Sequence, residues 1–401
     1  MVVIGQIISL FGNAALRFAL PLYLLNLTGS SALYGTVTAC AFLPAILLSP
    51  VGGIVADRVN KRNVMVVLDF FTAAVILLFL LFMNSANLII LLTVTLMLLY
   101  GIAGAYQPSV QASIPALVNQ EHFMAANSVI NTISSFASFM GPVLGGVLYS
   151  AYGLKTVLWV CTVCFVVSAV MEIFIKIPFH KRDSDGSIWR VVKADFKESI
   201  RFIWKDKPVI GKSLLVICRI NLFLSAMILV ALPYLITEVL NLGAAEANRL
   251  YGFANGALAA GGLAGGICAG IFANKLSIQK SGNLIIASAV CVFPMGAALI
   301  LCSSGMINYF VITICCFLIM AFSTIFTVQM MSFIQAETPQ SFIGKVIAVI
   351  LTIAMCAQPL GNALYGILFE ICKGFEYVVV LFSGVASLLT AVSARNIYKD
   401  F

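Results

Sequence analysis

The sequence predicts an all-α membrane protein with twelve transmembrane helices in two pseudo-symmetric six-helix bundles. Three observations lead to this prediction. Hydrophobic residues make up 62% of the 401 residues and charged residues only 9%, a balance that soluble domains do not have. The apolar runs are about twenty residues long, which is the length of a membrane-crossing helix. Finally, part of the first half of the chain recurs in the second half.

The internal repeat keeps one register over more than a hundred residues. Leu33-Tyr34-Gly35 recurs 217 positions later as Leu250-Tyr251-Gly252, and Pro142 recurs at the same offset as Pro359. The segment from Gly53 to Arg58 recurs, less closely, at the same offset. Because chance matches rarely share one register, we interpret the chain as two homologous halves.

Twelve candidate spans result when the chain is divided at charges, Gly/Pro clusters and polar runs. They are 3–26, 32–56, 63–83, 87–109, 124–149, 155–177, 211–239, 249–273, 282–303, 308–333, 344–371 and 375–396. The one long hydrophilic stretch lies between the sixth and seventh spans. We therefore expect bundles at 1–177 and 211–401, joined by a cytoplasmic linker at 178–210.

The linker pattern indicates an amphipathic helix on the membrane surface. Its apolar residues fall on one face at helical spacing, with basic residues elsewhere. The apolar face consists of Trp189, Val192, Phe196, Ile200 and Ile203.

The basic residues predict the orientation. An even number of spans puts both termini on one side, and a cytoplasmic placement puts 18 of the 23 Lys and Arg residues in cytoplasmic segments. We expect a multi-pass protein of the cell membrane with both termini in the cytoplasm. The net charge of +8 is then topological, so we expect no nucleic-acid partner.

The charged stretch at 52–62 separates two apolar spans. We expect it to form a tight loop at one membrane face, with its glycines allowing a neighbouring helix to approach. Asp57 would then face the positive N-terminal end of that helix. The alternative is an ordinary positive-inside loop with incidental glycines.

Several spans carry polar side chains that lipid would not accommodate. Asn13 and Arg17 lie one turn apart, and an arginine at this depth needs a water-filled cavity or a paired group. The alternative for Arg17 is a structural salt bridge or snorkelling. Asp69 either pairs with the basic residues of the 52–62 loop or titrates. In the span at 124–149, the segment 141–146 predicts a helix bend at Pro142 and close contact with a neighbouring helix. The bend either serves helix packing alone or shapes a transport gate.

The 52–62 stretch resembles a motif of the major facilitator superfamily, G-x-x-x-D-R-x-x-R/K. The matching residues are Gly53, Asp57, Arg58, Lys61 and Arg62. The resemblance extends over essentially the whole chain and implies the fold of that superfamily. It also implies that the motif holds the cytoplasmic gate closed, with Asp57 near the helix that begins at about Ile343-Gly344.

A second segment is similar to the fifth-helix motif of exporters in the superfamily. Its matching residues are Gly141, Pro142, Gly145 and Gly146, while the upstream glycine is Ala137 here. The spacing around Pro44 most resembles the macrolide-efflux and siderophore-exporter branch.

One feature departs from the drug/proton antiporters of the superfamily. Many of them carry an arginine in the fourth helix, whereas the span at 87–109 has no charge and has Tyr100 near that place. The candidate titrating groups are then Asp69, Glu172, Glu238 and Glu370. Proton coupling, with Asp69 as a possible carrier, is therefore implied by the resemblance alone.

Together these features predict a secondary active exporter of small amphiphilic molecules, drug-like, macrolide-like or siderophore-like. It would work by alternating access, as a proton antiporter; the alternative is an importer or lipid flippase on the same scaffold. The resemblance places the cavity between the spans at 3–26, 87–109, 211–239 and 308–333. Its expected polar contacts are Asn13, Arg17, Gln107, Gln111, Asn221 and Gln329.

We expect no enzyme, no catalytic residue, no cofactor and no metal site. Both histidines, His122 and His180, fall in loops, and the sequence has neither an H-E-x-x-H motif nor a P-loop. The expected partners are a small-molecule substrate, the lipid bilayer and H+ as coupling ion, and the expected oligomeric state is a monomer.

Overall fold

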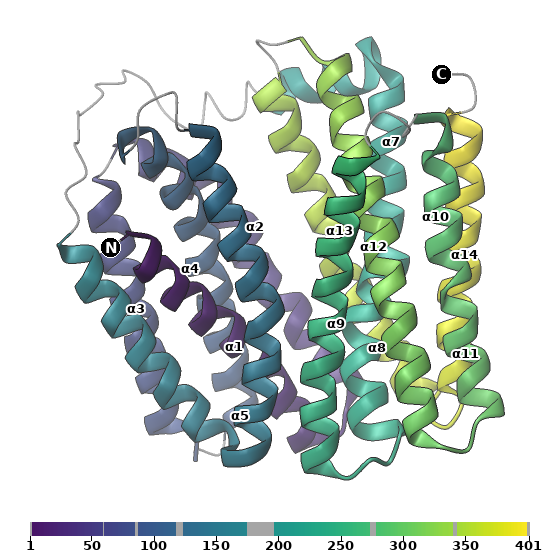
Figure 1. Ribbon diagram of the computed structural model, residues 1–401, viewed down its shortest axis with the longest axis horizontal. Coiled ribbons are helices and arrows are strands. Elements are labelled where there is room, and N and C mark those ends of the chain that lie inside the picture. Colours follow the sequence, from purple (N-terminus) through teal and green to yellow (C-terminus); the bar gives the residue numbers. More distant parts are fainter. Residues whose placement is uncertain are drawn as a thin grey trace. The chain divides into compact units, whose positions relative to one another are not determined.

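The computed structural model shows an almost entirely helical protein (Figure 1). It describes residues 2–58, 60–84, 87–117, 123–174, 196–272, 278–339 and 343–398, and these contain no strand. Eleven helical segments of this part are long and apolar enough to cross a membrane. One of them, Thr132–Ile173, is 42 residues long and broken in its middle, so the count fits the twelve predicted crossings.

The first half of the chain forms five helical elements. They are α1 (Val2–Thr28), α2 (Ser31–Arg58), α3 (Lys61–Phe82), α4 (Leu88–Leu117) and α5 (Phe123–Ile173). Within α5 the chain reverses at Gly153, whose φ of 76° and ψ of 177° are open to glycine but strained for other residues. The two parts of α5 correspond to the predicted spans at 124–149 and 155–177.

The second half has more elements because two of its crossings are irregular. The crossing Pro208–Val239 consists of α7 (Pro208–Ile220), η3 (Asn221–Ser225), α8 (Ala226–Tyr234) and η4 (Leu235–Val239), preceded by η2 (Phe202–Asp206). The crossing Ser281–Leu301 consists of α10 (Ser281–Val290) and α11 (Val292–Leu301), preceded by η6 (Ile278–Lys280). The remaining helices are α9 (Ala244–Ile271), α12 (Gly305–Glu337), α13 (Ile343–Ile371) and α14 (Glu376–Tyr398).

The helices form two compact units. Unit 1 comprises Met1–Gly29, Thr36–Ser184 and Gly243–Gly256, and unit 2 comprises Ser30–Gly35, Asp185–Leu242 and Ala257–Phe401. The repeated Leu-Tyr-Gly segments lie in the two short exchanged pieces. In unit 2, Gly35 packs against Gly366 of α13; in unit 1, Gly252 packs against Gly146 of α5.

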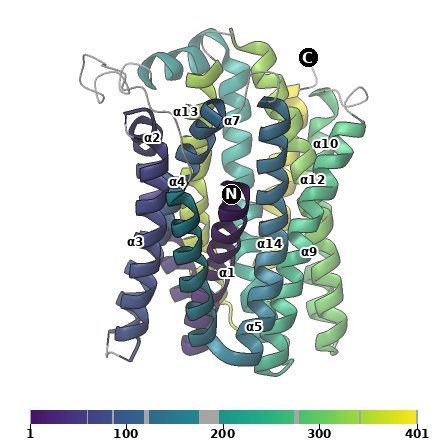
Figure 2. The same cartoon turned by 60° about the vertical axis from the view of Figure 1, so that its left-hand side comes forward.

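The core of unit 1 is the packing of α1 on α5 (Figure 2). A Cβ on Gly141 would collide with Ala14, and a Cβ on Gly145 would lie 3.5 Å from the Cα of Ala15. These two glycines of the 141–146 segment, one helical turn apart, therefore let α1 approach the α5 backbone.

Unit 2 uses the same device between α9 and α12. A Cβ on Gly261 would collide with the carbonyl of Phe317, and one on Gly265 with the carbonyl of Ala321. Elsewhere in this unit, α10 lies beside α14 and also contacts α12 (Figures 1 and 2). Gly261 and Gly265 thus give α9 a close-packing face towards α12.

Two consecutive glycines of α9, one facing α12 and one in open space, give a matched test of this packing. Gly265→Ala places a methyl group on the α12 backbone, so we expect a loss of about 1–3 kcal/mol in the free energy of unfolding. Gly266→Ala meets nothing within 4 Å and removes a flexible residue from a helix. It should leave stability unchanged or raise it by at most about 1 kcal/mol. Thermal unfolding in detergent measures both, and equal effects of the two changes would contradict the α9–α12 contact.

Candidate functional site

Unit 2 contains a cavity of about 400 Å³ between α7, η3, α10, α12 and α13. Its described lining has no charged side chain. The polar lining residues are amides and hydroxyls, namely Asn221, Ser225, Ser288, Ser323, Thr324 and Thr327. A pocket of this size with an apolar wall and few polar groups is typical of small-molecule sites.

Four methionines belong to the apolar wall on the side of α12 and α13, called here the methionine wall. They are Met320, Met330, Met331 and Met355. Methionine is unbranched and polarizable, so it adjusts to irregular apolar surfaces. This wall suits ligands of varied shape better than it suits one fixed outline.

The polar side of the pocket starts at an irregular turn. The element η3 is a π-helical turn in the middle of the crossing, and such turns are frequent at functional sites. The side-chain amide of Asn221 donates to the carbonyl of Ala354 at 2.9 Å, which ties η3 to α13. The carbonyl of Phe223 accepts from Tyr365 Oη at 2.9 Å and from Ser383 Oγ at 2.6 Å.

Arg17, in unit 1, lies on an aromatic ring. Its Cζ is 4.2 Å from the centroid of the Tyr100 ring on α4, a cation–π distance. None of the ion pairs found among the described residues includes Arg17. The nearby Asn13 is half-buried on α1. The predicted roles of Arg17, in a water-filled cavity, in a structural salt bridge or by snorkelling, stay predictions.

The other expected cavity residues have mixed outcomes. Asn221 lines the pocket, while Gln329 is buried in α12 between two lining residues without lining the pocket itself. Gln107 and Gln111 belong to α4, but their side chains lie outside the described residues. The roles of all these residues in substrate contact stay predictions.

The expected loop at 52–62 is shorter than the sequence indicated. The helix α2 continues to Arg58 and α3 starts at Lys61, so most of the stretch is helical. Asn60 caps α3 by accepting from the backbone N–H of Arg62 at 3.1 Å. The side chains of Asp57, Arg58 and Lys61 lie outside the described residues, and so do the surroundings of Gly53. The helix α13 begins at Ile343.

Two carboxyl groups are buried together in unit 1. Asp69 on α3 is 2% exposed and Glu172 near the end of α5 is fully buried. Ser9 Oγ donates to Asp69 Oδ1 at 3.0 Å, and Tyr106 Oη donates to Glu172 Oε1 at 2.9 Å. Sequence reasoning named both acids separately but did not predict that they interact. Each acid's hydroxyl donor is also about 60 residues away in the chain, so no local pattern reveals the cluster.

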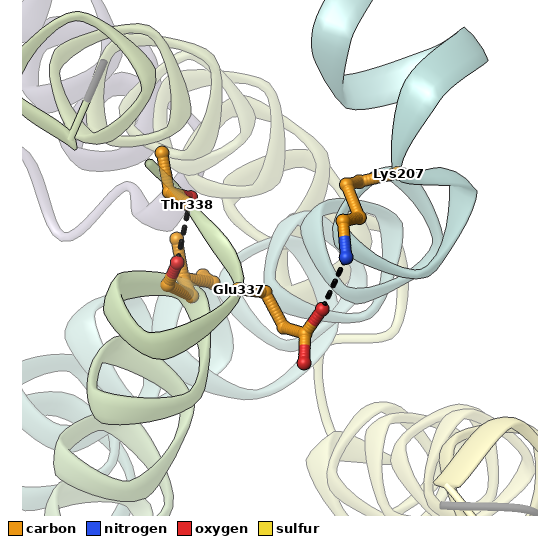
Figure 3. Close-up of polar contacts among 4 residues, drawn as sticks. Lys207, Glu337 and Thr338 are labelled. Carbon is orange, nitrogen blue, oxygen red and sulfur yellow. Dashed lines mark hydrogen bonds and ion pairs between the residues drawn. The ribbon is translucent and has the colours of Figure 1, made fainter. Parts of the chain in front are cut away.

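The remaining acids of interest lie at helix ends. Glu370 Oε2 accepts from Ser30 Oγ at 2.8 Å and from the backbone N–H of Ala32 at 3.3 Å, so it caps the start of α2 within unit 2. Glu238 is exposed. At the other end of unit 2, Lys207 forms an ion pair with Glu337 at 2.7 Å (Figure 3). Both of these side chains are partly exposed, so the pair contributes little to stability.

Comparison with known proteins identifies the family. The sequence model of the family described as the Major Facilitator Superfamily matches residues 2–393 of this chain. The chain belongs to the major facilitator superfamily. This superfamily consists of membrane transporters rather than enzymes, so the protein is an integral membrane transporter.

Relatives within the major facilitator superfamily include proteins named for efflux and a lysophospholipid transporter, LplT of Photorhabdus laumondii, which is 26% identical over 226 residues. Macrolide efflux protein A of Streptococcus pyogenes is 22% identical over 366 residues, covering 89% of this chain and 85% of that protein. The multidrug efflux pump Tap of Mycolicibacterium fortuitum is 23% identical, covering 88% and 85%. A solved structure of a bacterial homologue of the iron transporter ferroportin, in an inward-facing state, is similar with a TM-score of 0.72. That structure is 17% identical, and 97% of each chain is covered, so it supports the fold alone.

The Arg17–Tyr100 contact predicts a coupling between the two side chains. Tyr100→Phe keeps an aromatic face and should retain most of the interaction, whereas Tyr100→Leu should lose about 0.5–2 kcal/mol of stability. A double-mutant cycle with Arg17→Leu, measured by thermal unfolding, separates the pair energy from the loss of packing. A pair energy near zero for Tyr100→Leu would show that the contact is not stabilising.

Proposed function

We propose that this transporter is a secondary active exporter of small amphiphilic molecules. The observation that carries the proposal is the uncharged pocket of unit 2, with its methionine wall and its amide and hydroxyl groups. An apolar molecule with a few hydrogen-bonding groups fits this chemistry, as drug-like, macrolide-like and neutral siderophore-like compounds do. The efflux proteins among the relatives support the direction of transport.

The transport cycle is alternating access. Two bundles, 1–177 and 211–401, joined by a cytoplasmic linker at 178–210, rock around a central site. The motif residues Gly53, Asp57, Arg58, Lys61 and Arg62 latch the cytoplasmic side, where α13 starts at Ile343. The Gly141–Gly146 segment packs on α1 and α9 in unit 1 and carries the bend at Pro142 that shapes the gate.

The energy comes from protons moving inward in exchange for substrate. Both termini lie in the cytoplasm, which the distribution of 18 of the 23 basic residues supports. The protein works as a monomer, since both homologous halves lie in one chain.

A bulky side chain in the pocket tests the substrate site. Thr324→Trp fills the cavity, so we expect efflux of erythromycin or ethidium from energised cells to fall at least tenfold. Ser332→Trp, on the same helix at an exposed position outside the pocket, is the matched control and should transport normally. Intracellular accumulation is measured with and without a protonophore, which should abolish wild-type expulsion. If the wild-type protein instead accumulates the compound in cells, the proposal of export is replaced by uptake. If Thr324→Trp shows normal efflux, this pocket is not the substrate site.

The latch is tested by Asp57→Asn, with Asp206→Asn as control. Asp206 is exposed in η2, far along the chain from the motif. Losing the charge of Asp57 removes its attraction to a helix N-terminus, so we expect efflux to fall several-fold while the protein level stays unchanged. Equal transport by the two variants would speak against a latch at Asp57.

A further inference from the structure

The buried carboxyl pair has oxygen atoms that no described group satisfies. Asp69 Oδ2 and Glu172 Oε2 are both buried, and neither has a hydrogen-bond partner. The other oxygen of each acid is already held, by Ser9 and by Tyr106. Buried polar atoms are rarely left without a partner. Two such atoms on interacting acids therefore need a hydrogen-bond donor, which a proton bound to one of the two carboxyl groups supplies.

Four helices enclose the pair. The acids come from α3 and α5, and the hydroxyl donors from α1 and α4. The α1 backbone passes close to Glu172, because a Cβ on Gly5 would lie 3.7 Å from its Cγ. On the α3 side, Met65 packs against the Tyr106 ring, one helical turn before Asp69. The donors are therefore held in fixed positions around the two acids.

No described cation neutralises the pair. On α1 the one charge is Arg17, two turns beyond Ser9 and stacked on Tyr100. On α3, Arg62 is two turns before Asp69 and next to Lys61, whose side chain is not described; α4 carries no acid or base. On α5 the one other charge is Lys155, at the far end of its crossing. None of the ion pairs among the described residues includes either acid.

We propose that Asp69 and Glu172 together bind one proton and that this site is where the proton of the transport cycle is carried. This inference rests on the proposed function and names its coupling site. Two carboxylates in an apolar interior repel each other and lose their hydration, so the doubly ionised pair is unfavourable without a positive ligand. One proton forms an O–H bond on a free oxygen, leaves one negative charge shared by the pair, and is later returned to water.

The geometry favours a proton over a metal ion. A hard metal cation takes about six oxygen ligands, whereas this site has two uncommitted carboxylate oxygens. The hydroxyl hydrogens of Ser9 and Tyr106 already point to the acids. No group of three or more His, Cys, Asp or Glu residues suited to a metal occurs in the described part of the chain.

The helix α3 connects this site to the latch motif. Asp69 lies two turns after Arg62, the last residue of the motif, on the same helix and on the same face. A change of charge at Asp69 therefore acts on the element that begins at the proposed cytoplasmic latch.

Infrared spectroscopy of the purified full-length protein in lipid nanodiscs tests the site without any substrate. The absorption of protonated carboxyl groups is followed between about pH 5 and about pH 9, a range wide enough for carboxyl titration. We expect a titrating band in the wild type that is lost in Asp69→Asn plus Glu172→Gln. The band should remain in the control pair Asp206→Asn plus Glu238→Gln, which alters exposed acids. Identical titration in the wild type and the buried-pair variant would overturn the proposal.

A transport measurement then separates coupling from export. Inverted membrane vesicles are given a proton gradient and labelled erythromycin, and exchange of labelled for unlabelled erythromycin is followed without a gradient. The buried-pair variant should lose gradient-driven uptake at least tenfold and keep exchange, which also shows that it is folded. Persisting gradient-driven uptake in this variant, or uptake driven by Na+ instead of H+, would overturn the proton site. Failure of the wild type to transport erythromycin under any condition would count against the proposed function, and the infrared band would still decide the site.

Discussion

Inside a bilayer every backbone N–H and C=O group of a helix has to be paired within the protein. The fold of this transporter depends on how those groups are paired where a helix is irregular. Proline at position 233 removes the N–H that would bond to the carbonyl of Leu229, and Tyr34 Oη donates to that carbonyl at 3.5 Å instead. At η3 the carbonyl of Phe223 receives two hydroxyl groups. Irregular backbone is thus placed where hydroxyl side chains of other helices reach it.

The same constraint explains the use of glycine. Helices in lipid gain little from burying apolar side chains, so they associate through close backbone contact. Gly141 and Gly145 provide that contact for α1, and Gly261 and Gly265 provide it for α12. In both cases the glycines are four residues apart, which puts them on one face of the helix. Regular helices pack through such faces, while hydroxyl-capped turns such as η3 line the pocket.

The sequence predicted the twelve crossings and the family because these depend on local length, composition and motif spacing. It did not predict which helix faces meet. The sequence placed Tyr100 where many related antiporters carry an arginine in the fourth helix. That the Tyr100 ring contacts Arg17 of the first helix is seen only in the structure. The π-helical turn at Asn221 has one counterpart in the sequence. It is the amide of Asn221 and the hydroxyl of Ser225, four residues apart in an otherwise apolar span. The helical extension of α2 to Arg58 was missed because charge density was taken to end the helix.

The methionine wall makes the pocket sensitive to oxidants. Conversion of a thioether to a sulfoxide turns a flexible apolar side chain into a polar one, and reductases reverse the change. With four methionines around one cavity, a single oxidation would place a strong acceptor where the wall is now apolar. Oxidation of one of these methionines would therefore change which molecules fit the proposed pocket, without adding a net charge to its wall.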